Sequence, residues 1–151
     1  MLIFAPTDAF LSATQEGELL MSSNHKLLSL ALIIFGAVFC LIYPLAMVWP
    51  SGWAWHQGPP AANDYFMMIV GVYATLGIFL ILAARDPAAN ASLIWFTIYS
   101  SIVHALVMAW ESMRNPAMGG HLTGDVPALL LVAVVLGLLM MGVQRSSVAR
   151  A

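Results

Sequence analysis

The chain has 151 residues, of which 62% are hydrophobic and only 8% are charged. A typical soluble domain has about 25% charged residues, so this composition and a mean hydropathy of +0.91 exclude an ordinary soluble fold and indicate a membrane protein. The formal net charge of -2 gives no electrostatic reason to expect nucleic acid as a partner, and the length predicts one domain.

The first 25 residues differ in kind from the rest of the chain. Residues 1–25 carry three acidic side chains and lack the basic start of a secretory signal. We expect them to form a tail or a short interfacial segment. A four-helix transmembrane domain should then occupy residues 26–151.

Four apolar segments in that domain are long enough to cross a bilayer, which takes about 20 helical residues. The predicted spans are residues 27–49, with Pro44 inside, and residues 65–84, 92–112 and 126–143. The joining segments are short and rich in Gly, Pro, Asn and Asp, so neighbouring spans should be antiparallel. The sequence therefore predicts an all-α fold, a four-helix transmembrane bundle running up-down-up-down.

Basic residues predict the orientation of the bundle. An even number of spans places both termini and the loop at Arg85 on one side. That side also carries Lys26, Arg145 and Arg150, whereas the opposite side has only Arg114. By the positive-inside rule, the N and C termini are expected to be cytoplasmic.

Small residues four positions apart indicate where helices could approach closely, because interfaces within membranes favour them. Such pairs occur at Gly36/Cys40, Gly71/Thr75 and Ala133/Gly137. Each pair is a candidate contact between spans.

A polar stripe follows one face of the third span. With about 100° of rotation per residue, one face collects the candidate ligand-binding residues Thr97, Ser101, His104, Met108 and Glu111. We expect this face to point into the bundle, because a protonatable group that faces lipid costs several kcal/mol.

His104 allows three interpretations. It could handle protons or contact a small ligand, since imidazole both donates and accepts hydrogen bonds. With Met108 it could supply part of a soft copper site or one side of a haem, although no further ligands are evident. The simplest interpretation is a hydrogen bond to a side chain within the bundle, for which the candidates are Tyr43, Tyr73, Thr75 and Ser101.

The outer loops add further ionisable groups. His56, Glu111 and His121 could meet at one end of the bundle and bind a metal ion. Glu111 could instead form a surface pair with Arg114, three residues later. Asp125, with a proline two residues later, is interpreted as the N-cap of the fourth span.

Four stretches of the chain resemble a known family. They are WPSGWAWH (49–56), IVGVYATLGIFLILAARDP (69–87), SLIWFTIYSSIVHALVMA (92–109) and GHLTGDVPALLLVAVVL (120–136). Together they resemble a small bacterial family of four-span membrane proteins with no assigned function, over residues 26–143. In outline the chain is also similar to DoxX-like four-helix membrane proteins. The resemblance implies no catalytic residue and is in keeping with a multi-pass protein of the bacterial inner membrane.

Two functions are expected from these observations. The first is a non-enzymatic accessory or structural subunit whose partners, besides the lipid bilayer, are other membrane helices in a complex or a homo-oligomer. The alternative is an intramembrane binding protein that uses the stripe at His104 to hold a small apolar ligand, such as a lipid, a quinone or a haem. The sequence requires no cofactor. Catalysis is less favoured, because we find no nucleophile–base arrangement, phosphate-binding glycine loop or HExxH motif.

Overall fold

The computed structural model describes residues 8–49 and 60–148. Within these residues the chain is all-helical, and four helical segments are long and apolar enough to cross a membrane. The all-α fold class and the number of membrane-crossing segments predicted from the sequence are therefore confirmed. The structure consists of α1 (Asp8–Cys40), α2 (Ile42–Val48), η2 (Pro60–Ala62), α3 (Asp64–Ala83), α4 (Ala91–Arg114), η3 (Pro116–Leu122) and α5 (Asp125–Val148), where η marks a 3₁₀ helix.

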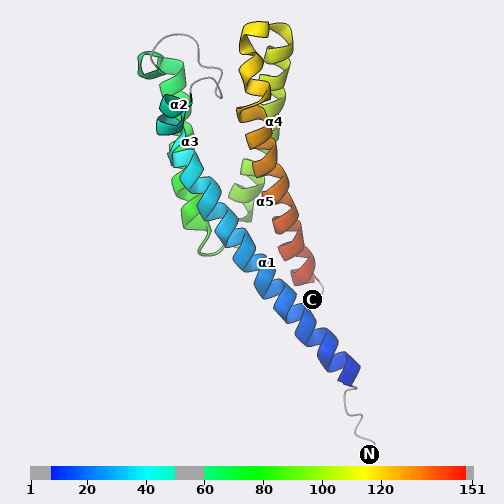
Figure 1. Ribbon diagram of the computed structural model, residues 1–151. Coiled ribbons are helices and arrows are strands. Elements are labelled where there is room, and N and C mark those ends of the chain that lie inside the picture. The colour runs from blue at the N-terminus through cyan, green and yellow to red at the C-terminus, as the bar shows by residue number, and fades with distance from the viewer. Residues whose placement is uncertain (1–7, 50–59, 149–151) are drawn as a thin grey trace, which may run out of the picture.

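The first helix is longer than the predicted span. It begins at Asp8 and continues without a break into the membrane segment, and Figure 1 shows its N-terminal part extending beyond the other helices. The helix therefore includes most of residues 1–25, for which a tail or interfacial segment is expected. Helices α3, α4 and α5 lie close to the predicted spans.

The predicted first span is divided into two helices at Leu41. Proline has no backbone N–H, and its ring crowds the carbonyl four residues earlier. Pro44 therefore disturbs the carbonyl of Cys40, where α1 ends, and Leu41 leaves the helical conformation with φ -98° and ψ 8°. The chain then continues as the short helix α2.

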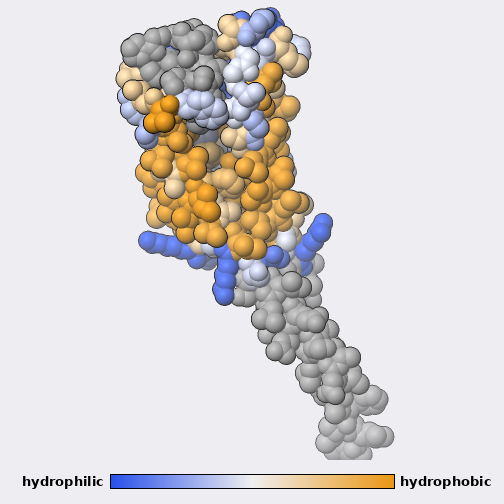
Figure 2. Space-filling view, in the orientation of Figure 1, coloured by the Kyte–Doolittle hydropathy of each residue, from blue (hydrophilic) through white to orange (hydrophobic). Residues whose placement is uncertain are grey.

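The long helices pack as two pairs, α1 with α3 and α4 with α5, and α1 also packs against α5. Helices α3 and α4 follow one another in the chain but touch only slightly. The main apolar core joins the two pairs, and its most deeply buried members include Leu28, Leu32, Leu80, Ile94, Leu136 and Met140. Figure 2 shows the outside of the bundle as an apolar belt with hydrophilic side chains at both of its edges.

Two glycines allow α1 and α3 to approach with their backbones almost in contact. A Cβ atom at Gly36 would lie 2.7 Å from the carbonyl oxygen of Gly77, and one at Gly77 would lie 2.5 Å from that of Gly36. The Cys40 thiol donates to the carbonyl of Ala74, at 3.5 Å. The predicted contact at Gly36 and Cys40 is thus confirmed, with α3 as its partner.

The other two predicted small-residue contacts differ from this one. A Cβ atom at Gly71 or at Gly137 would meet no atom within 4 Å. Thr75 is exposed and donates its hydroxyl to the carbonyl of Gly71 in its own helix. Ala133 is buried in the main core, so this pair lies in the packed interior without a close backbone approach.

We expect Gly77→Ala to destabilise the bundle, because the added methyl group must push α1 away from α3. Overpacking of this kind typically costs about 1–3 kcal/mol. Thermal unfolding of the protein in detergent would measure the loss. Gly71→Ala, in the same helix but with open space around it, is the matched control, and equal unfolding temperatures for the two variants would contradict the close approach.

Candidate functional site

A cavity of about 480 Å³ lies between the two helix pairs. Its walls come from α1, α2, α3, α4, η3 and α5, and most of its lining side chains are apolar. This volume is within the range of roughly 300–1,000 Å³ found for small-molecule sites. Its polar lining residues are Asn63, Tyr65, Tyr73, His104, His121 and Asp125.

Tyr73 and His104 form a hydrogen bond across the gap between α3 and α4. The Tyr73 hydroxyl and Nδ1 of His104 are 2.7 Å apart, and the Tyr73 ring lies edge-on to Phe39 of α1. We assign Tyr73 as the donor, because its proton has no other partner among the described residues. His104 then carries its proton on Nε2. This nitrogen bonds to no residue in the described part of the chain and keeps accessible surface, since it is absent from the buried unpaired atoms there.

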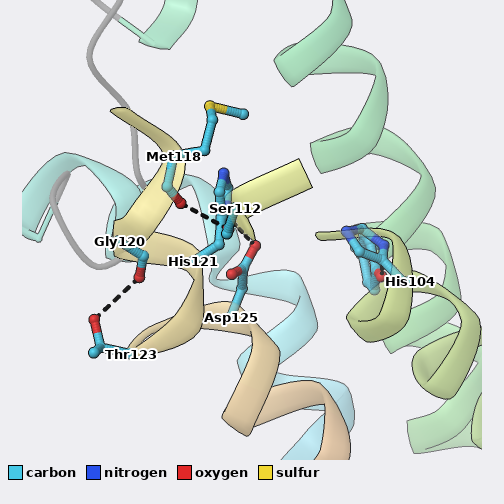
Figure 3. Close-up of polar contacts among 8 residues, drawn as sticks. His104, Ser112, Met118, Gly120, His121, Thr123 and Asp125 are labelled. Carbon is cyan, nitrogen blue, oxygen red and sulfur yellow. Dashed lines mark hydrogen bonds and ion pairs between the residues drawn. The ribbon is translucent and has the colours of Figure 1, made fainter. Parts of the chain in front are cut away.

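His121 and Asp125 form a second polar pair at the η3 end of the cavity. Nδ1 of His121 donates to Oδ2 of Asp125 at 2.8 Å, and the two side chains are only 9% and 11% exposed. The other carboxylate oxygen, Oδ1, has no accessible surface and no hydrogen-bond partner within the described structure. Figure 3 shows this pair on one side and His104 on the other.

The 3₁₀ helix η3 positions His121. The Ser112 hydroxyl, at the end of α4, donates to the carbonyl of Met118 at 2.8 Å, and the Thr123 hydroxyl donates to the carbonyl of Gly120 at 3.1 Å (Figure 3). Asn115 caps η3 by accepting a hydrogen bond from the backbone of the segment. These contacts fix η3 to α4 and close the turn that leads into α5, where His121 bonds to Asp125.

The structure separates the residues of the predicted polar stripe. Thr97 is fully buried and donates to the carbonyl of Leu93 in its own helix. Ser101 is also buried, and neither residue is among the described residues that line the cavity. Of the candidate ligand-binding residues, His104 and Met108 line it.

Glu111 lies outside the cavity lining, on the surface. Its carboxylate is 4.0 Å from the Arg114 guanidinium, and both side chains are largely exposed. This is the surface pair expected as the simpler interpretation.

The predicted metal set does not assemble among the residues that the structure describes. No group of three His, Cys, Asp or Glu side chains there could hold a metal ion. Glu111 pairs with Arg114 and His121 with Asp125. His56 lies outside the described residues, so its part in a metal site remains a prediction.

Asp125 is the cavity residue whose role the sequence did not reveal. The sequence predicts an N-cap at Asp125, but this residue is the first of α5, and its side chain accepts a hydrogen bond from His121. The prediction is wrong because η3 places His121, four residues before Asp125, within hydrogen-bond distance of the carboxylate. The sequence does contain a signal for this pair, because His121 and Asp125 are four residues apart in HLTGD. For His104, the structure selects Tyr73 from the four partners considered.

Together, the fold and the cavity define a four-helix membrane protein with a few polar groups in an apolar pocket between its helices. The model of the family of unknown function DUF6632 matches residues 22–151, so the chain belongs to that family. This confirms the resemblance to a family with no assigned function. No curated protein and no solved structure matches the chain significantly, so the likeness to DoxX-like proteins has no support from these comparisons.

We expect Tyr73→Phe to free Nδ1 of His104 and to destabilise the protein by about 1 kcal/mol, the typical net value of one hydrogen bond. The ¹⁵N signals of the imidazole should shift as the preference for the Nε2–H form is lost. Tyr99→Phe, at an exposed position on α4, should leave these signals unchanged. Identical His104 signals in wild type and Tyr73→Phe would show that the hydrogen bond does not form.

Proposed function

We propose that the protein binds a small amphipathic molecule in the cavity between its helix pairs. One observation carries this proposal: a cavity of about 480 Å³ combines apolar walls with polar side chains from α3, α4, η3 and α5. Ligand sites between bundle helices typically have apolar walls and a few convergent polar groups that orient the ligand.

The hydrogen bonding of these side chains supports a ligand site more than a purely structural network. In a buried structural network each polar atom normally has a partner, because an unsatisfied one costs about 1–3 kcal/mol. Here Nε2 of His104 has no protein partner in the described structure, and Oδ1 of Asp125 lacks any there. Because Nε2 of His104 keeps accessible surface, a bound molecule can accept a hydrogen bond from it.

Among the ligand types expected from the sequence, a lipid or a quinone suits the cavity better than a haem. A haem carries two anionic propionates, and no Lys or Arg is among the described lining residues. Anions placed in a low-dielectric site without a partner are strongly unfavourable. The polar contacts also differ from the expected stripe, because Tyr73, His121 and Asp125 replace Thr97, Ser101 and Glu111.

The role of accessory or structural subunit remains a prediction. Many exposed side chains on the long helices are large and apolar. Such surfaces suit lipid tails and neighbouring helices equally, because lipid is as apolar as leucine. The cavity, in contrast, favours one of the two expected functions specifically.

Copurification tests the proposal. The protein would be extracted in mild detergent, and its small molecules would be measured by solvent extraction and mass spectrometry. We expect one species in near-stoichiometric amount. Ala128→Trp should reduce it by more than half, because Ala128 lines the cavity and a tryptophan there would fill part of it.

The matched control is Val134→Trp, on the same helix at an exposed position that is not among the described lining residues. This variant should keep the wild-type content. Equal loss in both variants, or wild-type protein that carries only a random sample of bulk lipid, would contradict a binding function for the cavity.

A further inference from the structure

We propose that the cavity selects an uncharged amphipath whose head group offers a carbonyl or hydroxyl oxygen to Nε2–H of His104. The inference rests on the proposed binding function and specifies the chemical class of the ligand. It follows from three features of the site: an open donor on His104, the lack of a cationic side chain in the described lining, and a carboxylate of which one oxygen is paired with His121 and the other is buried.

The open donor is the imidazole of His104. The Tyr73 hydroxyl occupies Nδ1, so the ring keeps its N–H at Nε2, and His104 is one of the residues that line the cavity. No described residue accepts from this group. The Phe39 ring packs edge-on against Tyr73 with 5.0 Å between ring centroids, which holds the hydroxyl in place and with it the direction of the imidazole. An oxygen acceptor on a ligand would complete the hydrogen bonding of His104.

An anionic head group would find no counter-charge. None of the described lining residues is Lys or Arg, and Arg114, near the η3 end, already lies beside Glu111. Asp125, which also lines the cavity, is itself acidic. A carboxylate, phosphate or sulfonate in the cavity would therefore add an unpaired negative charge to a site that holds an acidic residue.

A cationic head group is also disfavoured, although Asp125 is acidic. Oδ2 of Asp125 accepts a hydrogen bond from His121, and Oδ1 has no accessible surface. An ammonium group could reach the carboxylate only by displacing His121 or by moving the Asp125 side chain. The accessible donor on His104 would, in addition, repel a cation that has no lone pair to offer.

The rim of the cavity fits the apolar part of such a ligand. Ile34 and Val38 on α1, Ile69 on α3 and Leu131 on α5 line the cavity and are between 40% and 57% exposed. These side chains belong to the membrane-crossing helices, whose outer surface is the apolar belt in Figure 2. A hydrocarbon chain can therefore extend from the cavity into the bilayer while its head group lies at His104.

A series of probes with one alkyl chain and different head groups tests the inference. The probes are a long-chain alcohol, a methyl ketone, an alkylsulfonate, an alkylamine and the alkane. Binding would be measured from the rise in the unfolding temperature of the purified protein with probe concentration, since a ligand that binds the folded state stabilises it. We expect the alcohol and the ketone to bind about tenfold more tightly than the other three, as one hydrogen bond predicts.

Two variants at one position identify the contact. His104→Phe should remove the preference for the alcohol and ketone, whereas His104→Gln should retain part of it, because its amide can donate from near the position of Nε2. If His104→Phe does not fold, the probe series on wild type and on His104→Gln still decides the question. Tightest binding of the sulfonate or amine, or equal binding of alkane and alcohol, would overturn the inference and leave the binding function standing. If no probe binds, both proposals fall.

Discussion

The hydrogen bond between Tyr73 and His104 connects two helices that otherwise touch only slightly. In the hydrocarbon region no water competes for these groups, so polar side chains there either find one another or remain unsatisfied. The bond therefore links the two helix pairs at a place where α3 and α4 touch only slightly. It also occupies Nδ1 of His104, so that Nε2 is the ring nitrogen without a protein partner in the described structure. The geometry of the candidate site depends on this one contact.

Close helix packing surrounds the hydrogen bond between Tyr73 and His104. On one side, Gly36 and Gly77 hold α1 against α3 at backbone contact. Between the pairs, a continuous apolar core includes Leu28 of α1, Ile94 of α4 and Leu136 of α5. The cavity adjoins this core, because Phe39, Ile42 and Val132 belong to the core and also line the cavity. A separate small cluster, centred on Ala105, joins α4 to α5 beside it. Apolar packing and polar groups thus meet at the cavity, where core side chains form part of its wall.

Sequence alone predicted the features that depend on local pattern. Hydrophobic length located the spans, and helical periodicity placed Thr97, Ser101 and His104 on an inward-facing side. Periodicity does not say which neighbour a face meets. It could not show that Gly36 meets Gly77, or that Thr97 satisfies its hydroxyl within its own helix.

The hydrogen bond between His121 and Asp125 could not be predicted from local sequence pattern, for a different reason. In sequence, Asp125 before an apolar span has the usual form of a helix cap, and a cap requires only local geometry. The carboxylate binds His121 instead because η3 is a 3₁₀ segment that Ser112 ties back to α4. That arrangement depends on contacts between elements. The sequence identified the titratable groups of this end of the bundle but gave Asp125 a different partner.

The unpaired groups of the cavity have a thermodynamic consequence for the whole bundle. A ligand that binds only the folded state adds stability in proportion to the logarithm of its concentration over its dissociation constant, about 2.7 kcal/mol at a hundredfold excess. A molecule held at His104 would contact walls from both helix pairs, in the region where α3 and α4 lack direct packing. It would therefore stabilise the association of the two helix pairs at the place where α3 and α4 make little direct contact. Ligand binding in the cavity and the association of the two helix pairs are therefore thermodynamically coupled.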